Sequence, residues 1–483
     1  MGLAKNSLLY LISNISIKAT SFFLLPLYSH LVAPEVYGHI YVVAAFSNFL
    51  AVFLPLSMSI CISRFFFDCK TDDEVNRLYS TIVLFVFLTS AVFIIPCFVF
   101  LDQLSNLINL PRGYVLAGLV MSFLNVFYQV LLALLYACQK AVKVSVISTC
   151  VGVFQIIIQL VLVLLMEDKG AALLITMLIH SVTTFVIFVI YSKPYLCLTF
   201  NWSETGKYIK YSLSQFPSDV SNWLVNFTDR IFINKYINSA SAGVYGIGSN
   251  IGQIPMMIFN SLNSAFSPYV NSQYKTIEEE NNFESVEELK NNLSKVFMVV
   301  SSLLLMLMTS LVVMSNNIMQ LLNPAYSDAF IVIVVMMLAS LMNNFRCIFM
   351  APLAYNISYT KVKSIIWVFA GVINILMNFY LIPRYGIYSA CINSLITYTI
   401  TFFLMLYYGK KAISIDYDWS ILLKTLAISA VFSFTIFLGS GWLAFVTKVL
   451  LLPIYIYVCD KCSLKINLNK ILYQYVKIIR NKQ

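Results

Sequence analysis

The sequence predicts an all-α, polytopic membrane protein with two six-helix lobes, related by an axis along the membrane normal, and two C-terminal helices. Three observations predict this architecture. Hydrophobic residues form 60% of the 483 residues and charged residues only 11%, against about 25% charged in soluble domains. Apolar runs follow one another from residue 8 to residue 458. Motifs of the first half also recur in the second half, in the same order.

Each apolar run is long enough to form a membrane span. A spanning helix needs about 20 mainly apolar residues, and a backbone in lipid has no water to pair with, so helices are expected. The expected spans, about 14 in all, are 8–32, 37–63, 78–101, 113–138, 144–166, 170–192, 208–234, 241–268, 296–322, 326–354, 364–382, 386–408, 419–438 and 441–458. The expected parts are an N-lobe at 1–200, a C-lobe at 201–410, and spans 13 and 14 with a basic tail at 411–483.

Two motif pairs carry the internal repeat. The tripeptide Val-Tyr-Gly occurs at 36–38 and again at 244–246, which is 208 residues later. The pattern Gly-Val-x-[Gln/Asn]-Ile-x-x-[Gln/Asn] occurs at 152–159 and again at 371–378, which is 219 residues later. Equivalent points lie six spans apart, an even number, so the two halves have the same orientation. This is a known transporter plan, in which one site between the lobes opens to each side in turn.

The basic residues predict the orientation of the chain. With the N-terminus in the cytoplasm, 23 of the 31 basic residues fall in cytoplasmic ends, loops and the C-terminal tail. Only Arg112, Lys169, Lys235 and Arg384 fall on the opposite side. Both termini and the Glu-rich linker at about 271–295 should therefore be cytoplasmic. The net charge of +10 is interpreted as a signal for orientation and for lipid headgroups rather than for nucleic acid.

Several function classes have no support in the sequence. It contains no Gly-x-x-x-x-Gly-Lys-[Ser/Thr] phosphate loop, and its ten Cys residues are scattered, which indicates no disulfide framework. Cys459 and Cys462 form a Cys-x-x-Cys without further nearby ligands, so neither a metal nor a cofactor is expected. The first apolar run is too long for a cleaved signal peptide and carries Lys18 in its middle.

Span 7 is the least lipid-like of the expected helices. Gln215, Asp219, Asn222, Asn226 and Asp229 follow one another at steps of four or three residues and so share one helical face. A charge at the bilayer centre costs about 2.5–3.5 kcal/mol on insertion scales, so this face must meet water or polar partners. In span 1, Ser7, Asn14, Lys18 and Ser21 show a milder version of the same design, and the 208-residue offset aligns Lys18 with Asn226.

These residues predict a cationic cavity for an anionic cargo such as a diphosphate, because Arg binds it through two hydrogen bonds and Lys as a point charge. The alternative for each residue is a packing role: Arg64 could pair with Asp68, and Lys448 could dock spans 13 and 14. The candidate substrate-binding residues are Lys18, Arg64, Asn226, Arg230 and Arg346, and the candidate ion-coupling residues are Asp219 and Asp229.

The chain resembles bacterial polysaccharide flippases, the Wzx type of the multidrug/oligosaccharidyl-lipid/polysaccharide exporter superfamily, over about residues 5–408. The likeness is carried by Pro217, Trp223, Asp229-Arg230, Ala242 to Gly246, Pro268, Asn374, Asn378, Leu381 to Gly386, Tyr37-Gly38 and Arg64 to Phe66. Each motif is loose alone, and their order and spacing together are more specific.

The resemblance implies a flippase, not an enzyme, that moves undecaprenyl-diphosphate-linked oligosaccharide from the cytoplasmic to the periplasmic leaflet of the bacterial inner membrane. Its expected partners are this lipid-linked oligosaccharide and membrane lipids, with a polysaccharide polymerase and a chain-length regulator as candidates, and no nucleic acid. Related lipid II flippases place basic residues in a central cavity, including in the first span, and Lys18 matches that position with Lys in place of Arg.

Two other function classes stay open. A multidrug and toxin extrusion antiporter of the same superfamily would favour acidic residues for cationic drugs, whereas the spans here hold more basic than acidic residues. A membrane polysaccharide polymerase usually carries a long periplasmic loop with catalytic residues, and the longest outer loop expected here is about a dozen residues.

Overall fold

The computed structural model describes residues 24–197, 202–279, 283–355 and 357–464, and within these ranges the chain is helical with no strand. Eleven helices of the described ranges are long and apolar enough to cross a membrane. The protein is therefore an all-α, polytopic membrane protein. Contacts divide the chain into two compact units, residues 1–250 with 364–397, and residues 251–363 with 398–483.

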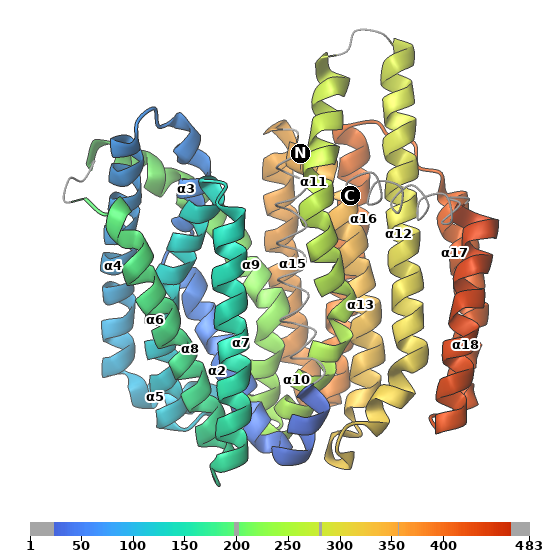
Figure 1. Ribbon diagram of the computed structural model, residues 1–483, viewed down its shortest axis with the longest axis horizontal. Coiled ribbons are helices and arrows are strands. Elements are labelled where there is room, and N and C mark those ends of the chain that lie inside the picture. Colours follow the sequence, from blue (N-terminus) through green and yellow to red (C-terminus); the bar gives the residue numbers. More distant parts are fainter. Residues whose placement is uncertain (1–23, 198–201, 280–282, 356, 465–483) are drawn as a thin grey trace, which may run out of the picture. The chain divides into compact units, whose positions relative to one another are not determined.

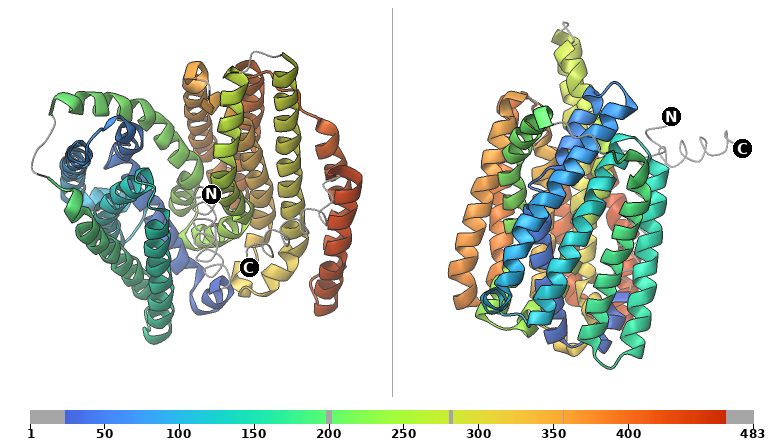
Figure 2. Two further views of the ribbon diagram at one scale, coloured as in Figure 1. Left: turned by 45° about the horizontal axis from the view of Figure 1, so that its top comes forward. Right: turned by 90° about the vertical axis from the view of Figure 1, so that its left-hand side faces the viewer.

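The first unit holds most of the N-terminal half and parts of two later helices. Its long helices run side by side, and α6 packs against α8 and α2 (Figure 2). Its helices are α2 (Pro34–Phe53), α3 (Ser59–Phe65), α4 (Asp72–Val99), α5 (Leu101–Ile108), α6 (Arg112–Ala137), α7 (Ala141–Leu165), α8 (Lys169–Ser192), α9 (Trp202–Tyr236), α10 (Ser239–Gly252, to residue 250), most of α15 (Ile357–Tyr385) and the first part of α16 (Ile387–Ala412).

The second unit is built around α12, which packs against α11, α13 and α17. Its core includes a cluster of Met306, Val313, Phe432, Tyr455 and Cys459, in which the Phe432 and Tyr455 rings stack with centroids 4.2 Å apart. Its helices are α11 (Ile254–Glu279), α12 (Phe283–Gln320), α13 (Ala329–Phe349), α14 (Ala351–Tyr355), α17 (Trp419–Ser433), α18 (Trp442–Cys459) and the remaining parts of α15 and α16.

Three expected spans are not among the eleven apolar helices. Most of the span at 8–32 lies outside the described residues, although residues 24–31 are helical. The span at 208–234 lies in α9, which is long enough but too polar. The span at 241–268 is divided between α10 and α11. The total of about 14 spans and the limits of the two lobes stay predictions.

The expected continuous helix at 37–63 is wrong, because the chain breaks between α2 and α3. α2 ends at Phe53 and α3 begins at Ser59. Pro55 lacks the backbone donor that a continuing helix needs. Leu56 and Ser57 then adopt left-handed backbone angles, with φ of 46° and 61°. Such angles are costly for residues other than glycine and often mark functional sites.

The expected continuous helix at 241–268 is also wrong. α10 ends at Gly252 and α11 begins at Ile254, and Pro255 again removes a backbone donor near the break. Side chains of α13 satisfy carbonyls at this point: Ser340 Oγ donates to the Gly252 carbonyl at 2.8 Å, and Asn344 Nδ2 donates to the Pro255 carbonyl at 3.2 Å. Broken helices are tolerated in a membrane protein where neighbouring helices supply such partners.

The Glu-rich segment at 271–295 was expected to be a linker, and it consists mainly of helix ends. α11 continues to Glu279 and α12 begins at Phe283. The two helices extend beyond α13 at the end where they are joined (Figure 1). The run of Glu residues has good helix propensity, so the solvated segment stays helical.

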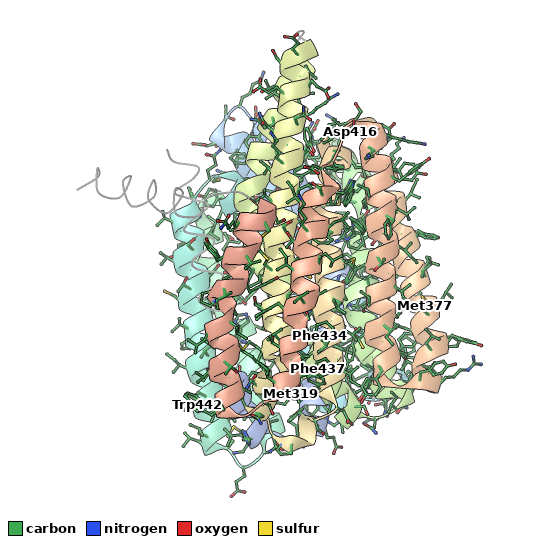
Figure 3. All side chains as sticks on the ribbon, turned by 90° about the vertical axis from the view of Figure 1, so that its right-hand side faces the viewer. Met319, Met377, Asp416, Phe434, Phe437 and Trp442 are labelled. Carbon is green, nitrogen blue, oxygen red and sulfur yellow. The ribbon has the colours of Figure 1, made fainter. Side chains whose placement is uncertain are left out.

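Helices α17 and α18 present an apolar outer surface. Phe434, Phe437 and Trp442 are 69%, 81% and 79% exposed, and they gather near one end of these helices (Figure 3). Aromatic residues at this level are typical of a membrane–water interface. On the inner side, Lys448 is fully buried, and its Nζ donates to Asn317 Oδ1 at 3.0 Å and to the Gly439 carbonyl at 2.7 Å.

The two helices that carry the repeated Val-Tyr-Gly tripeptides, α2 and α10, approach each other closely inside the first unit. A Cβ atom on Gly38 of α2 would overlap the Ser239 carbonyl, and one on Gly243 would overlap the Pro34 carbonyl. A Cβ on Gly246 would overlap the Tyr41 ring. Glycine therefore permits the close approach of α2 and α10, the two helices that carry the motif.

Candidate functional site

The polar face predicted for span 7 forms part of α9, and its residues do not all face the same surroundings. α9 is continuous from Trp202 to Tyr236 with Pro217 in its interior. Asp219 and Asn222 line a cavity of the first unit. Asn226 is half-buried and Asp229 is buried. The helix therefore carries its polar residues from an open cavity into a packed interior.

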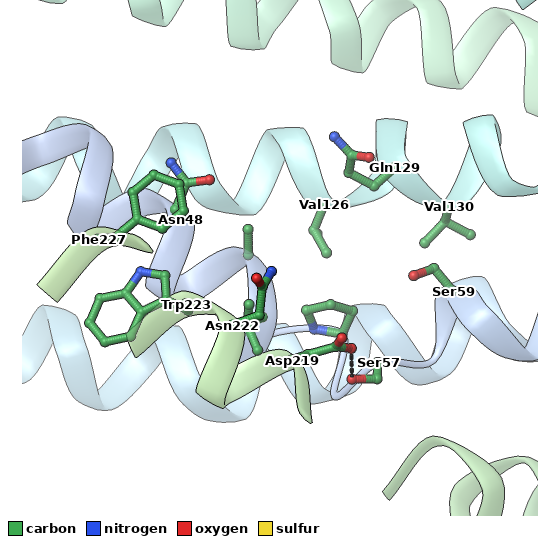
Figure 4. A pocket seen from close by; sticks show the side chains of 13 residues that line it. Asn48, Ser57, Ser59, Val126, Gln129, Val130, Asp219, Asn222, Trp223 and Phe227 are labelled. Atoms are coloured by element: carbon green, nitrogen blue, oxygen red, sulfur yellow. Dashed lines mark hydrogen bonds between the residues drawn. The ribbon is translucent and has the colours of Figure 1, made fainter. Parts of the chain in front are cut away.

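The cavity lies among α2, α3, α6 and α9 and has a volume of about 320 Å³. Val126, Gln129 and Val130 of α6 face Asp219 and Ser57 across it (Figure 4). Its lining mixes amide, hydroxyl and carboxylate groups with two aromatic rings and small apolar side chains. The lining residues are Asn48, Ala51, Val52, Pro55, Ser57, Ser59, Val126, Gln129, Val130, Asp219, Asn222, Trp223 and Phe227.

The break between α2 and α3 contributes directly to this cavity. Ser57, held in a left-handed conformation at the break, donates a hydrogen bond of 2.6 Å from its Oγ to Asp219 Oδ2 (Figure 4). A charge-assisted hydrogen bond of this kind is stronger than a neutral one. Sequence analysis named Asp219 but missed Ser57, because the two residues are 162 positions apart and only Pro55 hinted at the break.

Trp223, one turn along α9 from Asp219, is held in the cavity wall by two contacts with α2. Its indole Nε1 donates to the Ala45 carbonyl at 3.0 Å, and its ring lies edge-on to Phe49 with centroids 4.8 Å apart. The tryptophan is 7% exposed. A buried indole with its N–H satisfied is a rigid wall, so its position in the cavity does not depend on a ligand.

Arg230 and Asp229 form a buried ion pair further along α9. Arg230 Nη1 lies 3.2 Å from Asp229 Oδ1, and the two side chains are 6% and 5% exposed. Tyr245 of α10 donates its hydroxyl to Asp229 Oδ2. Arg230 Nη2 also donates to Ser249 Oγ at 3.4 Å. The acid that pairs with Arg230 is therefore Asp229, its neighbour in sequence. Neither residue lines the cavity.

Asn226 connects the cavity to this ion pair. Its Nδ2 donates to Asn222 Oδ1 at 2.9 Å and to the Asn222 carbonyl at 2.7 Å. Its own carbonyl accepts from Arg230 Nη1 at 2.7 Å. Two turns of α9 thus join the cavity residue Asn222 to the buried Arg230 through hydrogen bonds, and polar networks in a low dielectric can couple residues in this way.

The other predicted basic residues lie elsewhere. Arg64, at the end of α3, is exposed and pairs with Asp68 at 3.3 Å, as the packing alternative predicted. Arg346 of α13 lies in the second unit, where its Nη2 donates to Asn343 Oδ1 at 2.6 Å and it is 4% exposed. Lys18 lies outside the described residues. Among the described residues, the structure brings together Asp219, Asn226, Asp229 and Arg230 along α9.

A buried amide network is a feature that sequence analysis found only in part. Asn393 Nδ2 of α16 donates to Asn378 Oδ1 at 2.7 Å and to the Asn374 carbonyl at 2.9 Å. Asn378 Nδ2 donates to Asn374 Oδ1 at 3.0 Å and reaches Thr228 Oγ1 of α9 at 3.4 Å. The repeat motif indicated Asn374 and Asn378, whereas no motif indicated Asn393. The network ties α15 and α16 to α9 inside the first unit.

Within the described ranges, no group of three or more His, Cys, Asp or Glu side chains is arranged to hold a metal ion. The polar groups of the first unit are instead suited to hydrogen bonding and to charge compensation. A partly open cavity with polar groups beside a broken helix is an arrangement by which transporters bind a solute within the membrane.

Comparison with known protein families assigns this chain to one of them. The model of the family described as "Polysaccharide biosynthesis protein" matches residues 28–323. The chain belongs to this polysaccharide biosynthesis protein family. The match includes the whole of the cavity lining and the Asp229–Arg230 pair, so the candidate site lies within the part of the chain that is shared with the family.

Two Haemophilus influenzae proteins are similar to this chain at 23% identity, an "Uncharacterized membrane protein" over 284 residues and "Lsg locus putative protein 1" over 279 residues. The matches span 57% and 56% of this chain, and 67% and 66%, about two thirds, of the relatives.

Solved structures share the fold, among them the two described next. The lipid II flippase MurJ in an inward closed conformation is 16% identical, with a TM-score of 0.71 over 92% of this chain and 98% of that chain. An inward-facing multidrug resistance MATE family transporter of the MOP superfamily is 14% identical, with a TM-score of 0.62 over 84% of this chain and 98% of that chain. At these identities the likeness shows the fold alone, which is one that transporters and flippases share.

Proposed function

We propose that this protein is a flippase that moves undecaprenyl-diphosphate-linked oligosaccharide units from the cytoplasmic to the periplasmic leaflet of the bacterial inner membrane. The units would supply surface polysaccharide such as O-antigen or capsule. A polysaccharide polymerase and a chain-length regulator would act on the product. The transport step makes and breaks no covalent bond, and alternating access between two six-helix lobes would carry the cargo across.

The observation that carries this proposal is the polar cavity at the α2–α3 break in a chain of the polysaccharide biosynthesis family. A membrane protein places irregular backbone and polar side chains within its spans only where they are buried in protein or line a water-filled cavity. Asp219, Asn222 and Gln129 meet in such a cavity. The many hydroxyl groups of an oligosaccharide cargo require polar partners of this kind within the bilayer.

The proposal assigns roles to the charged residues. Lys18, Arg64, Arg230 and Arg346 would attract or hold the diphosphate at successive stages, with Asn226 linking Arg230 to the cavity. Asp219 or Asp229 would carry a coupling ion or proton. Arg230 reaches the cargo only if its ion pair with Asp229 opens, so the pair would change partners when the cargo binds.

A reconstitution experiment tests the proposal. Proteoliposomes that hold the purified protein should move fluorescent undecaprenyl-diphosphate-linked oligosaccharide to the outer leaflet faster than protein-free liposomes. Lys18→Ala should abolish this movement, whereas Lys5→Ala, a basic residue before the same predicted span, should leave it unchanged. Cells that carry Lys18→Ala as their only copy should lose surface polysaccharide while the protein inserts at normal levels. Equal movement with and without protein would refute the flippase.

A drug antiporter is the second candidate, and one observation favours it. Asp219 is the only ionisable residue among the described residues that line the cavity, and a carboxylate suits a cationic drug. In this case proteoliposomes would exchange an organic cation such as ethidium for protons and would leave the lipid-linked oligosaccharide in place. Asp219→Asn would abolish the exchange. The two assays on the same proteoliposomes decide between the candidates.

A further inference from the structure

The cavity in the first unit has the wrong chemistry for a diphosphate. Phosphate groups bind to Arg, Lys and backbone N–H groups, which supply positive charge and donors. The described residues that line the cavity include no Arg, Lys or His, and they include the carboxylate of Asp219. If the cargo is a diphosphate-linked oligosaccharide, this cavity must serve a different part of it.

We propose that this cavity is a glycan subsite, which binds one neutral, hydroxyl-rich sugar of the lipid-linked cargo through Asn222, Gln129 and Asp219 against Trp223. The inference rests on the proposed flippase function and deepens it, because it assigns the sugar and the diphosphate to separate places. The cavity would then select the cargo by its sugar.

The first support comes from polar groups that the protein itself does not use. The Gln129 amide and the Ser59 hydroxyl make no hydrogen bond within the described ranges. Asn222 accepts through Oδ1 from Asn226 at 2.9 Å, which leaves its amide nitrogen available to donate. Asn48 donates to the Ala44 carbonyl at 2.8 Å, which leaves its oxygen available. Sugar hydroxyls both donate and accept, so they match this mixed set of groups.

The second support is the aromatic wall. Trp223 is held by the Ala45 carbonyl and by the Phe49 ring, independently of any ligand. An aromatic ring combines a large apolar surface with low conformational entropy. The apolar C–H face of a sugar ring can pack on such a wall while the hydroxyls around its edge meet the amides. A small inorganic anion would make no use of it.

Size and charge narrow the ligand further. The volume of about 320 Å³ is near the lower end of the range of about 300–1,000 Å³ for ligand pockets, which suits one sugar ring rather than a whole oligosaccharide. The Asp219 carboxylate can accept hydrogen bonds from hydroxyls and repels another carboxylate. An uncharged sugar should therefore bind better than a uronic acid.

Equilibrium binding to the full-length protein in lipid nanodiscs tests the inference. The probes are undecaprenyl diphosphate that carries a single galactose, a single glucuronic acid, or no sugar. We expect the galactose lipid to bind about tenfold more tightly than the bare lipid, from two or three net hydrogen bonds. The glucuronic acid lipid should bind no more tightly than the bare lipid.

Variants connect this preference to the cavity. Gln129→Ala and Asn222→Ala should each lower the preference for the galactose lipid about 3- to 10-fold, as expected for one lost hydrogen bond, and leave the affinity for the bare lipid unchanged. Gln103→Ala, an exposed amide on α5 away from the cavity, should change neither affinity. Trp223→Phe should weaken binding of the galactose lipid and keep an aromatic wall that preserves folding.

The outcomes separate the two levels of inference. If wild-type protein binds all three lipids equally, or if Gln129→Ala weakens the bare lipid as much as the galactose lipid, the glycan subsite is wrong and the flippase stands. Tighter binding of the glucuronic acid lipid than of the galactose lipid would overturn the choice of a neutral sugar. If no lipid binds above empty nanodiscs, the proposed function fails and the subsite fails with it.

Discussion

Arg230 and Asp229 show how adjacent residues can form a buried ion pair within one helix. The pair is completed by Tyr245, which donates to the second carboxylate oxygen, and by Ser249. Removing one partner of a buried pair leaves an uncompensated charge, which costs far more than removing both. This asymmetry provides a way to separate a packing role of Arg230 from a role in transport.

Arg230→Ala should therefore destabilise the protein by about 3–5 kcal/mol, seen as a lower midpoint of thermal unfolding in detergent. The double variant Asp229→Asn/Arg230→Gln removes both charges and should unfold at a midpoint much closer to that of the wild type. If Arg230 also contacts the diphosphate, the double variant should fold and yet fail in the flipping assay. A wild-type midpoint for Arg230→Ala would show that the pair contributes little to stability.

Lys448 shows a different solution to a buried charge, because its described partners are an amide oxygen and a carbonyl. It is fully buried and donates to Asn317 Oδ1 and to the Gly439 carbonyl. These contacts join α18 to α12 and to the segment before α18, and the packing role of Lys448 stays a prediction.

Lys448→Ala should lower stability by about 1.5–3 kcal/mol, the contribution of hydrogen bonds from a charged donor, and leave transport per folded molecule unchanged. Lys424→Ala on α17 is the control, since that lysine is exposed. Thermal unfolding measures the first effect and the flipping assay, corrected for folded protein, measures the second. Loss of transport at full stability would place Lys448 in the mechanism.

At the level of elements, the break between α2 and α3 stores backbone strain beside the cavity. Leu56 and Ser57 both have left-handed φ values, and each such residue costs of order 1–3 kcal/mol. Ser57 recovers part of this cost through its hydrogen bond to Asp219. The hydrogen bond to Asp219 thus helps to stabilise the break, and the break in turn holds the Ser57 hydroxyl against the acidic residue of the cavity.

Leu56→Gly should keep or raise the unfolding midpoint, because glycine adopts φ > 0 without strain. Leu56→Val should lower it clearly, because a β-branched residue is a genuine outlier at this angle. Leu88→Val on an exposed position of α4 controls for the loss of one methylene group and should have a small effect. Equal midpoints for Leu56→Gly and Leu56→Val would mean that the left-handed turn is not kept in the folded protein.

The buried amide network links α9, α15 and α16 through side chains whose donors and acceptors must all be satisfied. Asn378 and Asn393 are 1% and 0% exposed and hydrogen-bond to each other. The counterpart of Asn378 in the first half of the repeat, Gln159 on α7, is only half-buried. The repeat therefore keeps the residue pattern in both halves, but its two amide side chains are fully buried only in the second half.

Asn378→Ala and Asn393→Ala should each cost about 1–3 kcal/mol, the desolvation penalty of the partner left unsatisfied. The double variant should cost less than the sum, because both changes remove the same bond. Gln159→Ala should cost much less than either. Thermal unfolding of the four proteins measures these effects, and strict additivity would show that the network is not coupled.

At the scale of the whole molecule, the described helices are those of a polytopic membrane protein, and the orientation rests on the basic residues. The excess of Lys and Arg in the predicted cytoplasmic loops and in the tail is the signal that orients spans during insertion. The extended ends of α11 and α12 carry the Glu-rich segment, so the side on which this segment lies can be tested directly.

Reporter fusions after Lys295 and after Gln483 should both report the cytoplasm. A fusion between residues 438 and 441, just before α18, should report the periplasm if both C-terminal helices cross the membrane. Alkaline phosphatase and green fluorescent protein serve as opposite reporters for each point. A periplasmic signal after Lys295 would invert the second half of the chain and defeat the predicted topology.

The sequence by itself determined the features that depend on local composition and periodicity. Apolar runs identified the membrane-spanning helices because a helix in lipid satisfies its backbone within the segment. Steps of three and four residues identified Asp219 and Asn222 on one face of α9, and both line the cavity. The motif pairs identified the glycines and asparagines at which helices approach closely.

Only the tertiary structure decided which polar group meets which, because that depends on helices far apart in the chain. The sequence left the partners of Asp219 and Arg230 open, and the structure pairs Asp219 with Ser57 and Arg230 with Asp229. No sequence motif indicated Asn393, because its partner Asn378 lies on α15 and meets it only when α16 packs beside that helix. A buried polar group costs free energy until a partner satisfies it, and many partners are compatible with one local pattern, so the choice is made when the helices pack.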